Sequence, residues 1–106
     1  MNMINNYFGM KKVIARGKES GLFYGSFHYM VGTVLMLETG NQLYTISGFE
    51  TVADIAEEGK CEARFNGCFN SMVITDAIEV VECTEQAIKR IESKMEKNKE
   101  IKNKNQ

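Results

Sequence analysis

The stretch Val13-Ile14-Ala15-Arg16-Gly17-Lys18-Glu19-Ser20-Gly21-Leu22-Phe23-Tyr24-Gly25 places two short apolar segments on either side of a polar turn. β-Branched residues open the first segment and aromatic residues occupy the second, a composition typical of strands. The turn contains Gly17, Ser20 and Gly21, residue types that favour tight turns. The sequence therefore predicts a hairpin with strands over residues 12–15 and 22–28.

The same turn is a candidate anion site. Arg16 directly follows the first predicted strand, and its guanidinium presents a planar fork of donors that matches phosphate or carboxylate. Backbone N–H groups of a glycine-containing turn can surround an anion, and Ser20 with the amide of Gly21 would add donors. Two simpler interpretations stay open: the segment is only a structural turn, or Arg16 forms a surface ion pair with Glu19 or with an acid nearer the C-terminus.

Further strands are expected over residues 33–38 and 43–47, with a hairpin turn at residues 39–42 between them. Together with the first hairpin they would form a four-stranded antiparallel meander. The later segments that we expect to be extended are residues 61–65, 72–74 and 77–83.

Two segments have helical spacing. Val52, Ile55 and Ala56 recur at this spacing between Thr51, which can cap a helix start, and Gly59, which can end a helix.

A second helix is expected to begin after Thr84, where Ile88, Ile91 and Met95 form one narrow apolar stripe. This stripe could pack on the domain's own sheet or on a second copy, and we expect a homo-oligomer. Arg90 lies away from the stripe, where we expect it to be solvated.

These elements predict a single α+β domain over residues 10–96. It would contain an antiparallel sheet of five to six strands, a short mid-chain helix and a C-terminal helix. Residues 1–9 would form an N-terminal extension, and residues 97–106 are polar and lysine-rich, which indicates a frayed tail.

Composition excludes several function classes. The net charge of −1 argues against a face for duplex nucleic acid, and no apolar run is long enough to span a membrane. Residues 1–9 lack a signal-peptide pattern, so we expect a cytoplasmic protein. Cys61, Cys68 and Cys83 are an odd number with no zinc-ligand spacing, which favours buried, reduced thiols. With no catalytic, metal or cofactor motif, we expect a non-enzyme.

Aromatic residues near the turn are candidates for stacking on a base. Tyr24 and His28 are expected on one strand face, although such a pair can equally be half-buried sheet surface. Arg64 and Phe65 form a second polar and aromatic cluster. Tyr44 is a further candidate, as an aromatic residue in a predicted strand.

Three segments resemble a family of small phage and prophage proteins. The family's V-I-V-R-T-Y-S-A-G-V is matched by residues 13–22, and its I-W-R-W-x-G-A-x-T-L-S-E-I-A by residues 43–56. Its L-T-D-A-I-E-I-I-P-C-T-E-x-A is matched closely by residues 74–87, so that the resemblance covers residues 12–95. The family's paired Trp and Arg are replaced around Tyr44, which is the one aromatic residue retained there.

A phage origin implies a class of function. Small oligomeric phage proteins include sponges, which sequester the nucleotide signals of bacterial defence systems such as Thoeris and CBASS. By analogy we expect an anti-defence protein that binds a cyclic nucleotide or a cyclic ADP-ribose-type signal in the infected host's cytoplasm without cleaving it. Two alternatives stay open: a module that inhibits a host protein by binding it, and a structural accessory protein of the phage.

Overall fold

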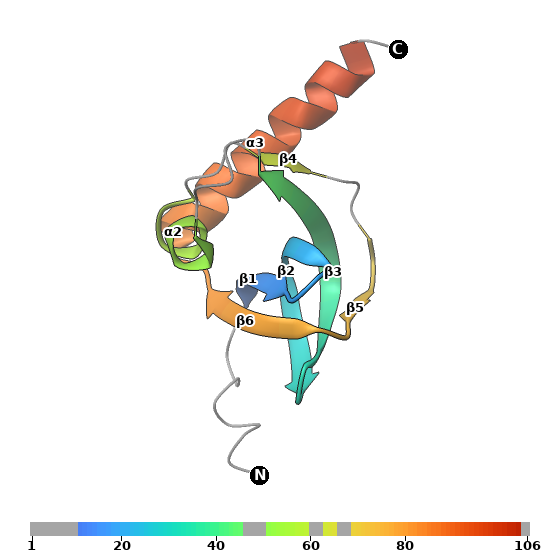
Figure 1. Ribbon diagram of the computed structural model, residues 1–106. Coiled ribbons are helices and arrows are strands. Elements are labelled where there is room, and N and C mark those ends of the chain that lie inside the picture. Colours follow the sequence, from blue (N-terminus) through green and yellow to red (C-terminus); the bar gives the residue numbers. More distant parts are fainter. Residues whose placement is uncertain (1–10, 46–50, 60–62, 66–68, 105–106) are drawn as a thin grey trace.

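The computed structural model describes residues 11–45, 51–59, 63–65 and 69–104, and these ranges confirm the α+β class (Figure 1). The predicted extension at residues 1–9 lies outside them. In chain order, the elements are β1 (Lys12–Gly17), β2 (Gly21–Val31), β3 (Val34–Thr45), α2 (Val52–Glu58), β4 (Ala63–Phe65), β5 (Met72–Ile74), β6 (Ala77–Glu82) and α3 (Glu85–Lys104).

All six of these strands join one antiparallel sheet in the order β4-β3-β2-β1-β6, with β5 paired to β3. The long strand β3 therefore has two partners along one edge. β5 pairs with its first half, from Leu35 to Leu37, and β4 pairs with its end, from Leu43 to Thr45. The sheet curls around these pairings, so that β5 and β6 close one side of a partly rolled barrel (Figure 1).

The predicted turn at residues 39–42 is wrong, because β3 continues through it as one strand. Gly40 lies opposite Gly25 of β2, where the two backbones approach closely. A Cβ atom on Gly25 would lie 2.0 Å from the carbonyl oxygen of Thr39. The glycine that suggested a turn instead permits close strand packing. The end of the strand predicted over residues 43–47, residues 46–47, lies outside the described residues.

The two faces of the sheet bury two separate cores. Ile14 and Tyr24 pack under the helices, where Ile55 and Ile91 complete a cluster. Val13 and its neighbours on the other face pack inside the curl of the sheet; this second cluster comprises Val13, Ala15, Phe23, Leu35, Leu37, Ile74 and Ala77.

A register shift lets β3 contribute to both cores. The pairing moves from Ser26–Thr39 to Phe27–Leu37, which leaves Glu38 as an extra residue in β3. An extra residue of this kind reverses the side to which later side chains point. Leu37 therefore lies inside the curl, whereas Leu43 packs under the helices.

Both helix starts and the end of α2 follow the predicted capping pattern. The hydroxyl of Thr51 accepts a hydrogen bond from the amide of Asp54, and Gly59 ends α2 with a φ of 67°. The hydroxyl of Thr84 accepts from the amide of Ala87 at the start of α3. Each cap satisfies an N–H group that would otherwise lack a partner.

The apolar stripe of α3 packs on the domain's own core. Ala87 and Ile91 are fully buried there, and Ile88 and Met95 pack against the same cluster. The helix continues to Lys104 and includes most of the segment for which a frayed tail is expected, since Glu and Lys are good helix formers. Among the described residues, no helix is long and apolar enough to cross a membrane.

Candidate functional site

The β1–β2 turn surrounds the carboxylate of Asp76. The amides of Glu19 and Ser20 donate to its Oδ2 at 2.8 and 3.0 Å, and the hydroxyl of Ser20 donates to Oδ1 at 2.5 Å. The Ser20 hydroxyl, followed by the Glu19 amide, lowers the pKa of the Asp76 carboxyl. The Ser20 hydroxyl, one of the donors expected to bind an anion, is therefore occupied by a carboxylate of the chain itself.

Two glycines shape this turn. A Cβ atom on Gly17 would lie 1.9 Å from the Ser20 hydroxyl oxygen and 2.6 Å from Oδ1 of Asp76. Gly21 has a φ of 106°, a region that favours glycine. The turn can close on Asp76 because both positions lack a side chain.

Arg16 forms a surface ion pair with an acid nearer the C-terminus, which is one of the two simpler interpretations that the sequence left open. Its Nε and Nη2 atoms both lie 2.6 Å from Oε1 of Glu79, which is opposite Arg16 in the β1–β6 ladder. Both side chains are nearly half exposed. The partner comes from β6 and not from the adjacent Glu19, because strand pairing places Glu79 directly across from Arg16.

Tyr24 is buried, so its ring has no exposed face for stacking on a base. Its side chain is 2% exposed, and its hydroxyl donates to Oε2 of Glu92 on α3 at 2.8 Å. Lys12 lies 5.7 Å from the ring centre and 3.5 Å from the same oxygen of Glu92. Burial, and then the hydrogen bond to Glu92, raise the pKa of Tyr24. These contacts make Tyr24 a link between sheet and helix.

His28 is exposed, whereas Tyr24 is buried. A register irregularity between Phe27 and Tyr29 interrupts the expected alternation at His28. The imidazole is exposed, with Nδ1 3.0 Å from Oε1 of Glu38 and an edge contact to the ring of Tyr29.

The remaining predicted residues meet in the β3–β4 ladder. The register places Tyr44 opposite Arg64, and Leu43 opposite Phe65. The side chains of Tyr44, Arg64 and Phe65 lie outside the described part of the structure. The backbone of β4 lies against α3, so these positions are close to that helix (Figure 1).

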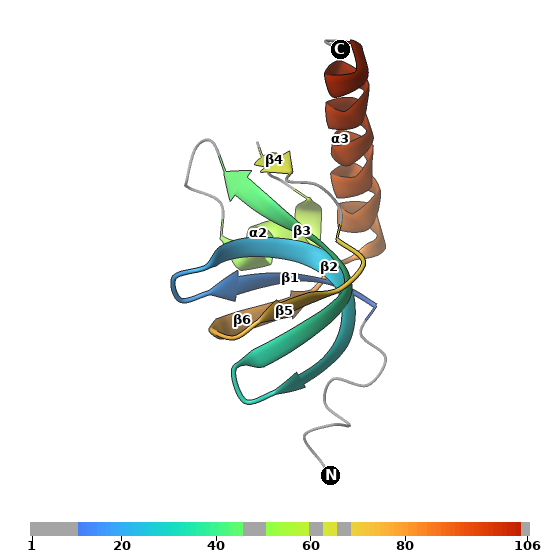
Figure 2. The same ribbon diagram turned by 90° about the vertical axis from the view of Figure 1, so that its right-hand side faces the viewer.

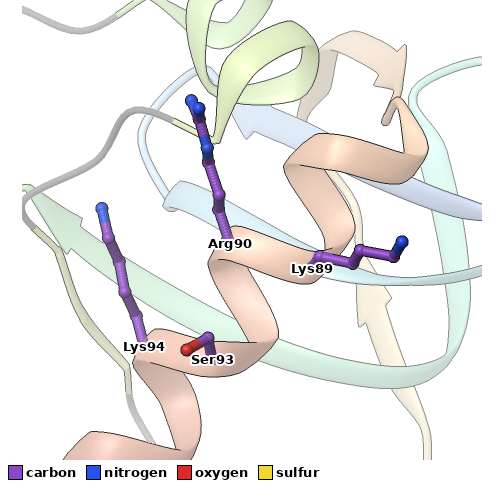
Figure 3. A pocket seen from close by; sticks show the side chains of 4 residues that line it. All are labelled: Lys89, Arg90, Ser93 and Lys94. Carbon is purple, nitrogen blue, oxygen red and sulfur yellow. The ribbon is translucent and has the colours of Figure 1, made fainter.

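A hollow on α3 lies in the same region (Figure 3). Its volume is about 400 Å³, and its described lining residues are Lys89, Arg90, Ser93 and Lys94. Arg90 and Lys94 extend toward the same side, one helical turn apart, while Lys89 points away from them. The hollow therefore presents several cationic donors and a hydroxyl group.

The end of α2 orients two of these cations. Arg90 Nη1 donates to the carbonyl of Glu58 at 2.8 Å, and Lys94 Nζ lies 3.5 Å from the carbonyl oxygen of Gly59. Arg90 is exposed, as expected, and its guanidinium also has this backbone partner. Cations near the carbonyl end of a helix also interact favourably with its dipole. The spacing of Arg90 and Lys94 is visible in the sequence, but their proximity to α2 required the tertiary fold.

Close packing between α2 and α3 holds this arrangement in place. A Cβ atom on Gly59 would lie 2.9 Å from Cβ of Arg90 and 3.0 Å from the carbonyl oxygen of Ala87. The hydroxyl of Thr84 donates to the carbonyl of Glu57 at 2.6 Å. The backbone beside the hollow is thus supported by α3 at more than one point.

Cys83 is a buried free thiol, as expected. Burial, and then the nearby charge of Glu82, raise the pKa of Cys83 to about 12. A thiol of this kind is a weak nucleophile near neutral pH. Cys61 and Cys68 lie outside the described residues.

Comparison with known protein families gave a match. No curated protein and no solved structure matches the chain. The model of one protein family, described as a domain of unknown function (DUF6948), matches residues 10–91, which include every strand and the first part of α3. The chain therefore belongs to the DUF6948 family.

Proposed function

We propose that this chain sequesters a nucleotide immune signal, of the cyclic nucleotide or cyclic ADP-ribose type, in the cytoplasm of a phage-infected host without cleaving it. The observation that carries this proposal is the α3 hollow, whose described lining consists of Lys89, Arg90, Ser93 and Lys94. Guanidinium groups bind phosphate through paired hydrogen bonds, and ammonium groups bind it as point charges. A nucleotide signal carries phosphate charge suited to these groups.

The chemistry of the hollow fits binding without cleavage. The hollow is an open depression of about 400 Å³, so that a phosphate could reach its cations directly from solvent. Ammonium and guanidinium groups donate hydrogen bonds and accept none. The three cations of the lining can therefore stabilise phosphate charge but cannot serve as a general base for hydrolysis.

The neighbouring β3–β4 ladder supports recognition of the base. Tyr44 and Arg64 occupy opposite positions there, and β4 lies against α3. Aromatic rings and guanidinium planes both stack on nucleobases with little dependence on sequence. In this proposal the cations of α3 bind the phosphates. The base lies next to the β3–β4 ladder, which contains the positions of Tyr44, Arg64 and Phe65.

Calorimetric titration with cyclic ADP-ribose and a cyclic dinucleotide tests the proposal, with linear ADP-ribose as the comparison. We expect at least one cyclic compound to bind. After heat denaturation of the protein, mass spectrometry should recover that compound intact. Arg90→Gln should weaken its binding about tenfold or more, because a charge-assisted contact is lost. Lys11→Gln removes an exposed positive charge outside the hollow and is the matched control.

Three results would contradict the proposal. One is the absence of binding for the whole panel, and another is recovery of a cleaved product. The third is full binding by Arg90→Gln together with loss of binding by Arg16→Gln, which would place the site at the β1–β2 turn. Circular dichroism of each variant checks that the domain stays folded, since Arg90 also contacts Glu58.

A further inference from the structure

One face of the sheet exposes apolar side chains from three strands. Tyr29 and Val31 of β2 are 45% and 65% exposed, Val34 of β3 is 38% exposed, and Val73 of β5 is 52% exposed. Met36 of β3 is partly exposed between them. We call these five residues the β2–β3–β5 face. Contiguous apolar surface of this kind is uncommon on monomers and marks interaction sites.

The strand register shows that the five residues are neighbours. Tyr29 pairs with Met36, Met36 pairs with Val73, and Val31 pairs with Val34. Directly paired residues share one side of a sheet. The adjacent residues Leu35 and Ile74 belong instead to the core inside the curl; Met30 packs against it. The β2–β3–β5 face is therefore the outer surface opposite that core.

The described helices cover a different part of the sheet. They pack over Ile14, Tyr24 and Leu43, and the tip of the β2–β3 hairpin lies at the end of the molecule away from α3 (Figure 2). Figure 1 shows the same separation from a second direction. The apolar stripe of α3 is used within the chain, so it does not cover this face.

The charges beside the face favour a second copy of the chain. His28 and Glu38 are the sole charged or imidazole side chains in the described strands β2, β3 and β5, and they lie 3.0 Å apart as a pair. A two-fold interface places each surface against itself, so that an unpaired charge would approach its own copy and repel it. The five residues of the β2–β3–β5 face carry no charge, so two copies can meet there without such repulsion. The exposed ring of Tyr29 supplies the aromatic surface in which interfaces are enriched.

We propose that the β2–β3–β5 face is a two-fold interface with a second copy of this chain. The interface would be centred on the row Tyr29, Met36 and Val73, with Val31 and Val34 beside it. It lies away from α3, so that each copy would keep its own α3 hollow accessible.

Sedimentation equilibrium of the full chain and three variants tests the proposal. We expect the wild type to form dimers, and Val73→Lys and Val34→Lys each to raise the dimer dissociation constant at least tenfold by placing like charges across the interface. Ile78→Lys is the matched control, because Ile78 is 48% exposed on β6, outside the β2–β3–β5 face. It should dimerise like the wild type.

Circular dichroism first shows whether each variant is folded, and the oligomeric states of the folded variants then support or overturn the interface. Loss of dimers in Val73→Lys and Val34→Lys, but not in Ile78→Lys, supports the interface. A wild type that stays monomeric up to millimolar concentration overturns it, including the case in which this face binds a host protein instead. Dimers that persist in both face variants, or that dissociate only in Ile78→Lys, place the contact elsewhere and also overturn it.

Discussion

Asp76 connects the β1–β2 turn to the start of β6 through a single carboxylate. Two backbone amides and the Ser20 hydroxyl donate to this carboxylate, and the amide of Lys18 donates to the backbone carbonyl of Asp76. The Ser20 hydroxyl, and then the Glu19 amide, stabilise the ionised form of the side chain, which is why the pKa of Asp76 lies below its ordinary value. The ionised carboxylate is therefore the form that holds the turn.

The lowered pKa of Asp76 predicts a pH-dependent loss of stability. A carboxyl whose pKa is lower in the folded state stabilises the fold above its unfolded pKa, about 3.9 for aspartate, and this contribution is lost as the pH falls through the folded value. Asp76→Asn should lower the melting temperature at pH 7. The difference from the wild type should shrink below about pH 4.

Thermal melts followed by circular dichroism from pH 7 to pH 2.5 measure this difference. Ser20→Ala should give a smaller change of the same sign, and combining it with Asp76→Asn should add little, because both substitutions disrupt one set of contacts. A constant difference between wild type and Asp76→Asn at every pH would contradict the assignment.

At the candidate site, the sequence predicted donors better than partners. Arg16 and Ser20 were recognisable as hydrogen-bond donors from their residue types and from the turn between them. Their acceptors, Glu79 and Asp76, are 63 and 56 residues away in sequence. Pairing of β1 with β6 brings them together, and no local pattern encodes such a distant pairing.

Strands β2 and β3 approach each other closely at Gly25. A side chain on Gly25 would meet the carbonyl oxygen of Thr39 at 2.0 Å and the Cα atom of Gly40 at 3.0 Å. Both obstacles belong to the backbone, so no change of rotamer removes the clash. The two long strands can therefore stay paired only if this position lacks a side chain.

Gly25→Ala should consequently lower the free energy of unfolding by about 1–3 kcal/mol, the usual cost of overpacking. Urea denaturation measures the change. Gly32→Asn is the control, because a Cβ atom on Gly32 would meet nothing within 4 Å and its φ of 59° is one that Asn tolerates. Equal stability of Gly25→Ala and the wild type would show that the strands can separate at little cost.

The hydroxyl of Tyr24 links β2 to α3 through Glu92. Tyr24→Phe keeps the buried ring and removes this one hydrogen bond, so it should lower the free energy of unfolding by about 0.5–1.5 kcal/mol. Tyr29→Phe is the matched control, since Tyr29 is 45% exposed and should change stability little. Urea denaturation at low protein concentration compares the two, and an equal loss in both variants would argue against the link.

At the scale of the whole molecule, one sheet separates two cores. β1 contributes to both, because Ile14 faces the helices while Val13 and Ala15 face the inside of the curl. Neither core can be lost without removing support from β1. We therefore expect the described domain to unfold as one cooperative unit.

Removing side chains from either core tests this cooperativity. Leu37→Ala and Ile91→Ala should each lower the free energy of unfolding by about 2–5 kcal/mol, because both residues are buried. Tyrosine fluorescence and circular dichroism should report the same urea transition in both variants. Ile78→Ala should cost less than about 1 kcal/mol. Separate transitions for the two probes would mean that the cores unfold independently.

The sequence by itself determined the class of this fold and much of its local structure. Residues close in the chain set these features: β-branched runs set β1 and β6, and Thr51, Gly59 and Thr84 set the helix ends. Only the tertiary structure decided which residues meet. It closed the β1–β2 turn on Asp76, converted the expected turn at residues 39–42 into continuous strand, and brought the cations of α3 to the end of α2. These outcomes depend on pairing and packing between distant segments, which local propensity does not specify.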